Sequence, residues 1–337
     1  MSSAKLNPFA SVLRQLTLSV VFSFRNEAQN LELLIPRLRE ACGGIGLKDF
    51  EFVFVNDCSN DGSLEFLLRE QKEKGDIVIV NTSRRFGVSE CVMAGLSESR
   101  GDYVVYMDAD LQDPPELIPE MMEMLLRERA DVVYTTRRRR DGETWIKLQI
   151  TKLGYWLLKA FSSIEVPYNS GDFKLLSRRV VNEVLRMKEQ KPFMRGLVTW
   201  VGFKQVQLFY DRLPRARGET KFPVFSRKVI YNFIDSALIS FSDAPLKAAL
   251  GMGIMITGGA CLLFCWIIVQ KLLGWALPGW TAVMATILVL GGVQLFIIGI
   301  LGLYIHTIYL QVKGRPLFIV DRVYRPRADV DQSQKNG

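Results

Sequence analysis

The chain has 337 residues, of which 49% are hydrophobic, and it carries a formal net charge of +8 at pH 7. Its single histidine, His306, excludes a catalytic triad in a soluble domain and a zinc site with several histidine ligands. Its five cysteines lack the C-x-x-C spacing of metal sites, and its positive charge suits a phosphate-bearing substrate, anionic lipid or nucleic acid.

Short apolar runs alternate with amphipathic stretches through the first 210 residues. The apolar runs predict strands at residues 16–24, 50–55, 77–80, 103–107 and 132–135. The stretches between them predict helices at 28–42, 63–74, 89–99 and 115–129. This order predicts an α/β layer fold of Rossmann-like type with a mainly parallel sheet. The G-x-G-x-x-G fingerprint of dinucleotide-binding folds is missing after the first strand.

Two loops at predicted strand ends carry acidic side chains. The loop after the second strand reads Asp57-x-Ser59-x-Asp61-Gly62, but a calcium loop would need a bidentate Glu where Leu68 stands. A nucleotide contact and a plain turn with a helix cap both remain open for this loop.

The fourth predicted strand ends in Asp108-Ala109-Asp110-Leu111-Gln112-Asp113 and a double proline. Open α/β sheets bind ligands at the carboxyl ends of their strands, and Asp108, Asp110 and Gln112 offer the hard oxygen atoms that Mg²⁺ or Mn²⁺ prefers. By itself the pattern is also typical of a solvated turn.

The last third of the chain has the composition of a membrane segment. Residues 222–241 predict an amphipathic helix in the membrane interface. Residues 248–270 and 272–312 hold no charged residue, and each tract exceeds the roughly 20 residues that cross a bilayer. A buried helical hairpin of a soluble protein is the alternative. Basic residues flank this region on both sides and only Lys271 lies in the connecting loop, so both termini are expected in the cytoplasm.

These patterns predict four parts. Residues 1–221 form a cytoplasmic catalytic domain, 222–245 an interfacial amphipathic helix, 246–311 a two-helix transmembrane domain, and 312–337 a cytoplasmic C-terminal segment and tail. No signal peptide is expected, because the N-terminus lacks a long apolar stretch. The tail from Arg325 onward is polar and is expected to be disordered.

Four separated segments resemble the family 2 glycosyltransferases of the GT-A fold. They read VVFSFRNE (20–27), VNDCSNDGS (55–63), SRRFG (83–87) and MDADLQDPPEL (107–117). Four more are similar to the polyprenyl-phosphate branch, which includes dolichol-phosphate mannosyltransferases and undecaprenyl-phosphate glucosyltransferases of the GtrB type. These are TRR (136–138) with GETW (142–145), SGDFKL (170–175), RGETKF (217–222) and VKGRPL (312–317). The resemblance covers roughly residues 17 to 324.

The resemblance implies roles for particular residues. The nucleotide-sugar-binding positions are Ser23, Arg25, Glu27, Asp57, Arg84 and Asp108. The positions for a Mg²⁺ or Mn²⁺ ion are Asp110 and Gln112, with Asp108 beside them. Relatives often have Pro at position 23 and Tyr at position 25; a guanidinium can stack on a base as a ring does, but which base is bound stays open.

The acceptor side is expected to hold a lipid phosphate. The implied phosphate-binding residues are Arg137, Arg138, Lys147, Thr151 and Lys221, and Lys147 lies one helical turn from Thr151. The arginine run also suits a solvated basic loop, and Lys221 also suits a snorkelling lysine.

Two positions are implied to be catalytic, Asp172 and Arg137. Asp172 matches the family's candidate general base or acceptor-side carboxylate. A phosphate monoester has a second pKa near 6 and is already anionic at neutral pH, so an orienting role suits Asp172 as well as a basic one. A plain turn residue after Gly171 is the third possibility.

The implied reaction is inverting transfer of a hexose, glucose from UDP-glucose being the first choice, to polyprenyl (undecaprenyl) phosphate at the cytoplasmic face of the inner membrane. The product would donate sugar for cell-surface glycan modification, such as that of lipopolysaccharide O-antigen. GDP-mannose or another UDP-sugar is the alternative donor. The expected partners are these substrates, the membrane and further copies of the chain, a tetramer by resemblance, with no nucleic acid.

Two other functions fit the sequence less well. A processive polysaccharide synthase shares the D-x-D pattern but has a Q-x-x-R-W motif, which residues 190–200 lack. A transport subunit with a nucleotide-sensing domain would not explain the acidic cluster, and two membrane spans make a poor translocation path.

Overall fold

The computed structural model describes residues 9–137, 170–211, 244–273 and 279–326. The chain divides into two compact units. Of the described residues, 9–137, 170–211 and 316–326 belong to the first unit, and 244–273 and 279–315 to the second. The segment that follows the second unit in sequence therefore belongs to the first.

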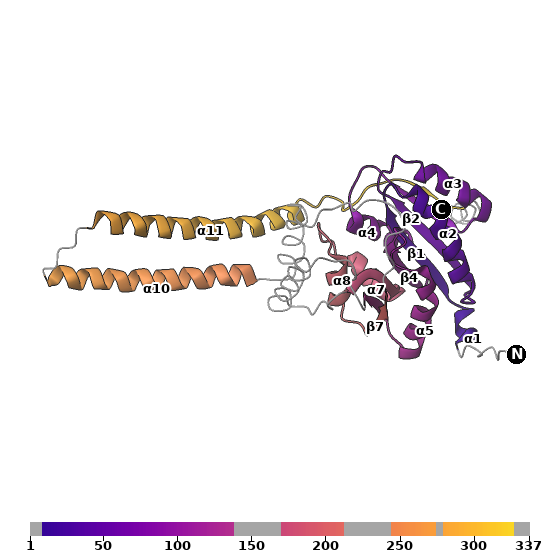
Figure 1. Cartoon of the computed structure of the whole chain (residues 1–337), viewed down its shortest axis with the longest axis horizontal. Helices are drawn as coiled ribbons and strands as arrows, with labels where there is room; N and C mark the ends of the chain where they lie inside the picture. The colour runs from indigo at the N-terminus through magenta and orange to yellow at the C-terminus, as the bar shows by residue number, and fades with distance from the viewer. Residues whose placement is uncertain (1–8, 138–169, 212–243, 274–278, 327–337) are drawn as a thin grey trace. The chain divides into compact units, whose positions relative to one another are not determined.

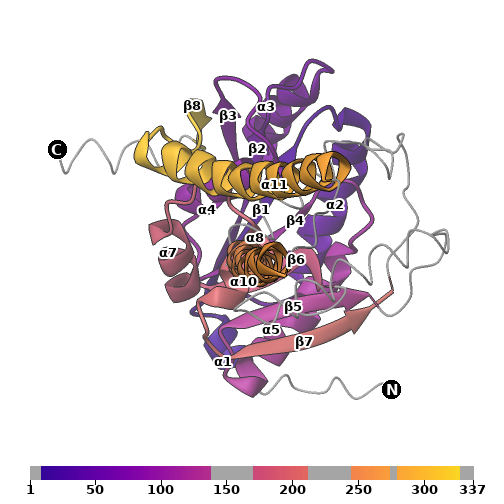
Figure 2. The ribbon, with the colours of Figure 1, turned by 90° about the vertical axis from the view of Figure 1, so that its left-hand side faces the viewer.

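An eight-stranded sheet forms the centre of the first unit (Figure 2). Its strands are β1 (Thr17–Phe24), β2 (Asp49–Asn56), β3 (Ile77–Thr82), β4 (Tyr103–Asp108), β5 (Val132–Arg137), β6 (Ser170–Ser177), β7 (Gln205–Tyr210) and β8 (Val320–Tyr324). They lie in the order β7-β5-β6-β4-β1-β2-β3-β8. The pairs β4–β1, β1–β2, β2–β3 and β5–β7 are parallel, whereas β6 and β8 run antiparallel to their neighbours. The prediction of a mainly parallel α/β sheet is confirmed.

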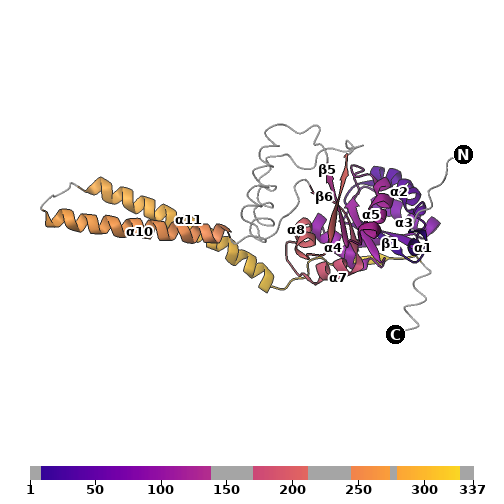
Figure 3. The same cartoon turned by 90° about the horizontal axis from the view of Figure 1, so that it is seen from below.

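Helices cover both faces of this sheet (Figure 3). The helices α2 (Ala28–Gly43), α3 (Ser63–Lys74) and α5 (Ile118–Glu128) lie on one face, and α4 (Val88–Glu98), α7 (Arg178–Arg186) and α8 (Met194–Trp200) lie on the other. Short helices α1 (Ala10–Leu13) and η1 (Pro115–Leu117) complete the described helical part of the unit. Buried side chains on both faces explain why β1 reads as a continuous apolar run and shows no alternation.

The first face is packed with aromatic and aliphatic side chains. Phe22 on β1 stacks on Phe54 of β2 with ring centroids 4.9 Å apart. Leu31, Leu34 and Leu38 of α2 are fully buried in the same cluster, at the three- and four-residue spacing of a helix face.

On the second face, α4 approaches the sheet closely at Gly95. A Cβ atom at this position would lie 2.3 Å from Cγ1 of Val21 and 2.9 Å from Cγ2 of Val55. Only a residue without a side chain lets α4 pack at this depth over the ends of β1 and β2.

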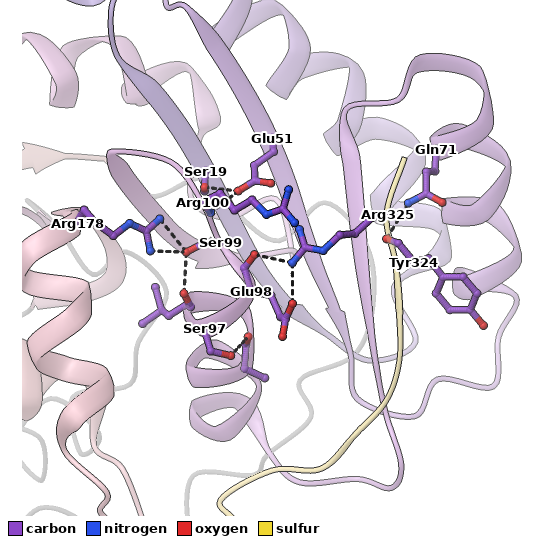
Figure 4. A network of polar contacts seen from close by, with 12 residues as sticks. Ser19, Glu51, Gln71, Ser97, Glu98, Ser99, Arg100, Arg178, Tyr324 and Arg325 are labelled. Carbon is purple, nitrogen blue, oxygen red and sulfur yellow. Dashed lines mark hydrogen bonds and ion pairs between the residues drawn. The ribbon is translucent and has the colours of Figure 1, made fainter. Parts of the chain in front are cut away.

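The chain returns to the sheet through β8, which pairs antiparallel with β3. Gln71 of α3 donates to the carbonyl oxygen of Tyr324 at 2.9 Å, and Arg325 pairs with the Glu98 carboxylate at 2.7 Å (Figure 4). In the same region, Arg178 donates to Ser99 Oγ at 3.2 Å, which ties α7 to the loop before β4 (Figure 4). The prediction that disorder begins at Arg325 is wrong for that residue, because its guanidinium is held by Glu98.

The second unit contains two long helices that pack against each other, α10 (Ala244–Leu272) and α11 (Trp280–Val312) (Figure 1). Within the described residues, one stretch is long and apolar enough to cross a membrane: Val289–Val312, with mean hydropathy 1.9. In α10 the described apolar stretch, Ala249–Ala260, is shorter. The expectation of two spans is therefore supported at one helix. The predicted interfacial helix at 222–245 lies almost wholly outside the described residues.

Candidate active site

The carboxyl ends of the parallel strands bring predicted site residues to one edge of the sheet. In the register of β1 with its neighbours, Ser23 pairs with Asp108 of β4 and with Val55 of β2. Arg25 follows directly after β1, and Asp57 directly after β2. Four residues predicted from separated motifs thus lie together, as the parallel topology requires.

The loops after β1 and β2 are fastened to each other. The Asn26 amide donates to Ser59 Oγ at 3.0 Å, and Asn26 Oδ1 accepts from the Asn60 amide at 2.9 Å. The Asp61 carboxylate accepts from the Ala28 amide at 3.0 Å. Burial opposes ionisation of Asp61, but hydrogen bonds from Ser63 and from backbone amides outweigh it and hold the pKa of this carboxyl below its usual value. The two loops therefore form one rigid platform.

Glu27 stands at the start of α2 on this platform. Its Oε2 accepts a hydrogen bond from Asn30 Nδ2 at 2.6 Å, and its amide donates to Ser63 Oγ at 3.3 Å. Its carboxylate is thus directed along the first turn of α2.

Asp57 links the platform to the loop after β3. It is buried, and its Oδ1 accepts a hydrogen bond from the Phe86 amide at 2.7 Å. Burial raises the pKa of the nearby Glu90, and the charge of Asp57 adds to this effect. Arg84 lies in the same loop with its guanidinium 4.0 Å from the centroid of the Phe86 ring. The predicted nucleotide residues Asp57 and Arg84 therefore meet at Phe86.

The acidic turn after β4 has a defined shape. Leu111 adopts a left-handed conformation with φ of 60°, and the Gln112 amide donates to Asp110 Oδ1 at 3.2 Å. Asp110 is 8% exposed, whereas Asp108 is half-buried at the strand end. Asp113, further along, accepts a hydrogen bond from the hydroxyl of Tyr210 on β7 and is buried. Asp113 is therefore a packing residue of the sheet.

This turn fits a divalent cation of a particular kind. It supplies two carboxylates and one amide oxygen, and the described residues hold no cluster of three or more His, Cys, Asp or Glu side chains suited to a metal. Magnesium and manganese sites of nucleotide enzymes take one or two carboxylates and complete their shell with phosphate oxygens and water. The donor set suits such an open site, and a closed structural site would need more protein ligands.

Asp172 lies on β6, between the ends of β4 and β5. Both of its oxygens accept hydrogen bonds from Arg195 of α8, the one from Nε to Oδ1 at 2.7 Å. Two residues further on, Lys174 pairs with Tyr106 of β4 and Tyr134 of β5. Lys174 is 2% exposed, and its burial lowers its pKa to about 7, against the opposing effect of the Asp172 charge.

The predicted acceptor residues are described only in part. Arg137 is the last residue of β5 and pairs with Tyr210, so its backbone lies at the same edge as Asp108. Arg138, Lys147, Thr151 and Lys221 lie outside the described residues.

Sequence analysis missed Arg195 and Lys174 as members of this cluster. Arg195 lies in residues 190–200, which lack the Q-x-x-R-W motif and carry no other recognisable pattern. A charged residue such as Lys174 inside a strand carries no sequence signal that distinguishes a buried side chain from an exposed one.

Comparison with known proteins adds to this geometry. Residues 19–185 match the family described as Glycosyl transferase family 2. The chain is 39% identical to an uncharacterised glycosyltransferase of Synechocystis sp., over 91% of this chain and 95% of that protein. It is 32% identical to the prophage bactoprenol glucosyl transferase homolog of Escherichia coli K12, over 91% of this chain and 99% of that protein.

One solved structure that the chain matches is glucosyl-3-phosphoglycerate synthase from Mycobacterium tuberculosis, in complex with Mn²⁺, UDP and glucosyl-3-phosphoglycerate. The TM-score is 0.48 and the identity 18%, over 71% of this chain and 85% of that chain.

Proposed function

The chain belongs to glycosyl transferase family 2, and from this premise we propose that it transfers a hexose from a nucleotide sugar to polyprenyl phosphate at the cytoplasmic face of the membrane. The observation that carries the proposal is the gathering of Ser23, Asp57, Asp108 and Asp110 at one carboxyl edge of the sheet. The bactoprenol glucosyl transferases among its relatives, which match it over nearly their whole length, support a lipid acceptor and glucose as the sugar.

The donor half of the reaction rests on the fastened loops after β1, β2 and β3. Ser23 Oγ is buried at the end of β1, next to Asp108 in register, and it has no hydrogen-bond partner among the described residues. A buried hydroxyl costs free energy until it is paired, and a nucleotide hydroxyl or phosphate oxygen would pair it. UDP-glucose is the proposed donor, with GDP-mannose and other UDP-sugars as alternatives.

Asp110 and Gln112, with Asp108 beside them, would hold a Mg²⁺ or Mn²⁺ ion. Such an ion, when bound, would neutralise charge on the departing nucleoside diphosphate. The protein's own contribution is to fix the two carboxylates: Asp110 is held by the Gln112 amide and Asp108 by the register of β4.

The acceptor needs orientation more than deprotonation. A lipid phosphate is mostly dianionic at neutral pH, so its oxygen can attack the anomeric carbon directly and invert its configuration. Arg137 at the end of β5 is proposed to hold this phosphate, together with Arg138, Lys147, Thr151 and Lys221. Helices α10 and α11 are proposed to anchor the enzyme beside its lipid as two membrane spans, with both termini cytoplasmic. The apolar stretch Val289–Val312 supports the span at α11.

The test is incubation of the purified full chain with labelled UDP-glucose, Mg²⁺ or Mn²⁺ and a short polyprenyl phosphate. Label in the organic extract supports the proposal, and a parallel screen of UDP-galactose, UDP-GlcNAc and GDP-mannose identifies the sugar. Donor binding without a lipid product from any of the four donors would refute it.

A further inference from the structure

Asp172 lies at an irregular point of the sheet. Between β5 and β6, Tyr134 pairs with Lys174 and Thr136 pairs with Ser170, so four residue steps on β6 span two steps on β5. The extra residues of this bulge are centred on Asp172. Bulges re-aim side chains next to active sites, and this one lies between the end of β4, with Asp108, and the end of β5, with Arg137.

Arg195 of α8 fixes the direction of this carboxylate. Its Nε and one terminal nitrogen each donate to a different oxygen of Asp172, in the bidentate geometry that gives an arginine–carboxylate pair both strength and direction. The side chains of Arg195 and Asp172 are 28% and 36% exposed, so the pair is partly shielded from water. A carboxylate paired in this way is stabilised in its ionised form and is a poor proton acceptor.

Two buried polar groups lie next to this pair in the sheet. Lys174 on the same strand is fully buried, and Tyr106 on β4 is also fully buried, with a hydroxyl that has no hydrogen-bond partner among the described residues. Among the described residues, the charges of Asp172 and Arg195 act on both groups, and the charge of Asp108 acts on Tyr106 as well. Loss of the Asp172 charge would leave the Arg195 guanidinium without the carboxylate that both of its donors contact.

We propose that Arg195 is a positioning residue that holds Asp172 as a fixed anion on the acceptor side of the site, so that Asp172 orients the acceptor phosphate and its cationic ligands and takes up no proton. This inference rests on the proposed function, because it assigns a role in transfer to a phosphate acceptor. It separates two roles for Asp172, base and orienting charge, between which the sequence alone does not choose.

The experiment compares Arg195→Ala, Arg195→Lys, Asp172→Asn and the double variant Arg195→Ala/Asp172→Asn in the full-length enzyme. The readouts are kcat and KM for UDP-glucose and for a short polyprenyl phosphate, between pH 5.5 and 8.5. Arg195→Ala is expected to lower kcat by about a hundredfold, the scale of a misplaced catalytic group. The KM for the donor should stay within about twofold, because the described donor-side loops follow β1, β2 and β3, whereas this pair joins β6 and α8.

Three further results distinguish a positioning role from a merely structural one. Arg195→Lys should recover at least about tenfold of the lost kcat, because a lysine keeps the charge without the bidentate fork. The double variant should lose no more than the worse single variant, because Arg195 acts through Asp172. In Arg195→Ala the pH at which kcat falls to half should rise, because a carboxylate that has lost its guanidinium partner is protonated more easily.

Arg179 provides the matched control. It makes the same two-oxygen contact with Asp131, which lies at the start of β5 and hence at the opposite edge of the sheet. Arg179→Ala should leave kcat and both KM values within about twofold of the native enzyme.

Opposite outcomes would overturn the inference. A large loss of kcat in Asp172→Asn together with native kcat in Arg195→Ala would mean that Asp172 acts as a base independently of Arg195. Losses of kcat that multiply in the double variant would mean the same. These results leave sugar transfer by the native enzyme intact, so they refute this inference alone. A native enzyme that transfers no sugar to the lipid from any donor would overturn the proposed function and this inference together.

Discussion

The buried lysine of β6 makes the most quantitative prediction. Lys174 is fully buried between two strands, and burial lowers its pKa from 10.5 to about 7; Asp172 works against this effect and Arg195 adds to it. The folded protein therefore holds this amine neutral over a pH range in which the unfolded chain keeps it charged.

The sign and size of the effect follow from proton linkage. Between pH 7 and 10.5 the unfolded chain binds the proton that the folded chain has released, so the free energy of unfolding rises with pH in this window. Below pH 7 both states are protonated and the full penalty applies. A pKa difference between 10.5 and about 7 corresponds to a destabilisation of about 5 kcal/mol, at 1.36 kcal/mol for each pH unit.

The perturbation is Lys174→Met, which keeps the length of the side chain and removes the charge. The assay is urea unfolding of the full-length protein in mild detergent, followed by tryptophan fluorescence, for the native and variant proteins in parallel. At pH 6.5 the variant should be the more stable by several kcal/mol, and by pH 10 this difference should fall to about 1 kcal/mol. All other titrating groups are shared, so the pH dependence of the difference belongs to Lys174.

Lys204→Met is the control for this measurement, because Lys204 is an exposed lysine next to β7. Its difference from the native protein should not change with pH. A difference between native and Lys174→Met that is constant from pH 6 to 10 would refute the reasoning, since Lys174 would then titrate alike in both states.

Three other predictions follow from the site and the packing. Asp110→Asn should abolish sugar transfer by weakening cation binding; near-normal activity with unchanged Mg²⁺ or Mn²⁺ dependence would contradict this. Arg137→Ala should raise the KM for the lipid acceptor more than the KM for the donor, and equal changes in steady-state assays would count against its role. Gly95→Ala should lower the free energy of unfolding by about 1–3 kcal/mol, because its Cβ would lie 2.3 Å from Val21 Cγ1; native stability in the urea assay would show that α4 can shift.

The first half of the fold could be predicted from sequence for a clear reason. The strands β1 to β5 are buried on both faces, so each is an apolar run bounded by polar loops, and the helices between them carry one apolar face. The helix predicted at 63–74 has the same bounds in the structure. The predicted strand at 103–107 extends one residue further, to Asp108, because ladder pairing with Ser23 continues to that point.

The later strands could not be predicted because tertiary pairing determines them. β6 contains Asp172 and Lys174, and β8 contains Asp321 and Arg322, so neither reads as an apolar run. β8 is paired with β3, far away in sequence: Tyr324 lies opposite Ile79 and Val323 opposite Val80. The local sequence pattern carries no information on such a pairing. The pairing of β8 with β3 is what places Arg325 against Glu98.

The sequence predicts where the candidate site residues lie better than it predicts which residues they contact. Strand-end motifs place Ser23, Asp57 and Asp108 at one edge, because any parallel sheet brings its carboxyl ends together. The partners of each side chain depend on elements that meet only in the fold. Asp57 is held by the Phe86 amide and Asp172 by Arg195, and no spacing in the sequence announces either contact.

The acidic run after β4 shows why this distinction matters for chemistry. Asp110 and Asp113 are three residues apart and look equivalent as cation ligands in the sequence. In the structure, Asp113 is 1% exposed and accepts a hydrogen bond from the Tyr210 hydroxyl, so it ties the turn to β7. The Asp110 carboxylate instead accepts a hydrogen bond from the backbone amide of Gln112, so the turn itself sets the direction of this side chain. Because the turn is anchored at the Asp113 carboxylate, it can present the Asp110 carboxylate to a cation without the entropy cost of ordering that side chain. The left-handed residue Leu111 lies between the two and bends the chain, so that Asp113 anchors the turn and Asp110 can face a cation.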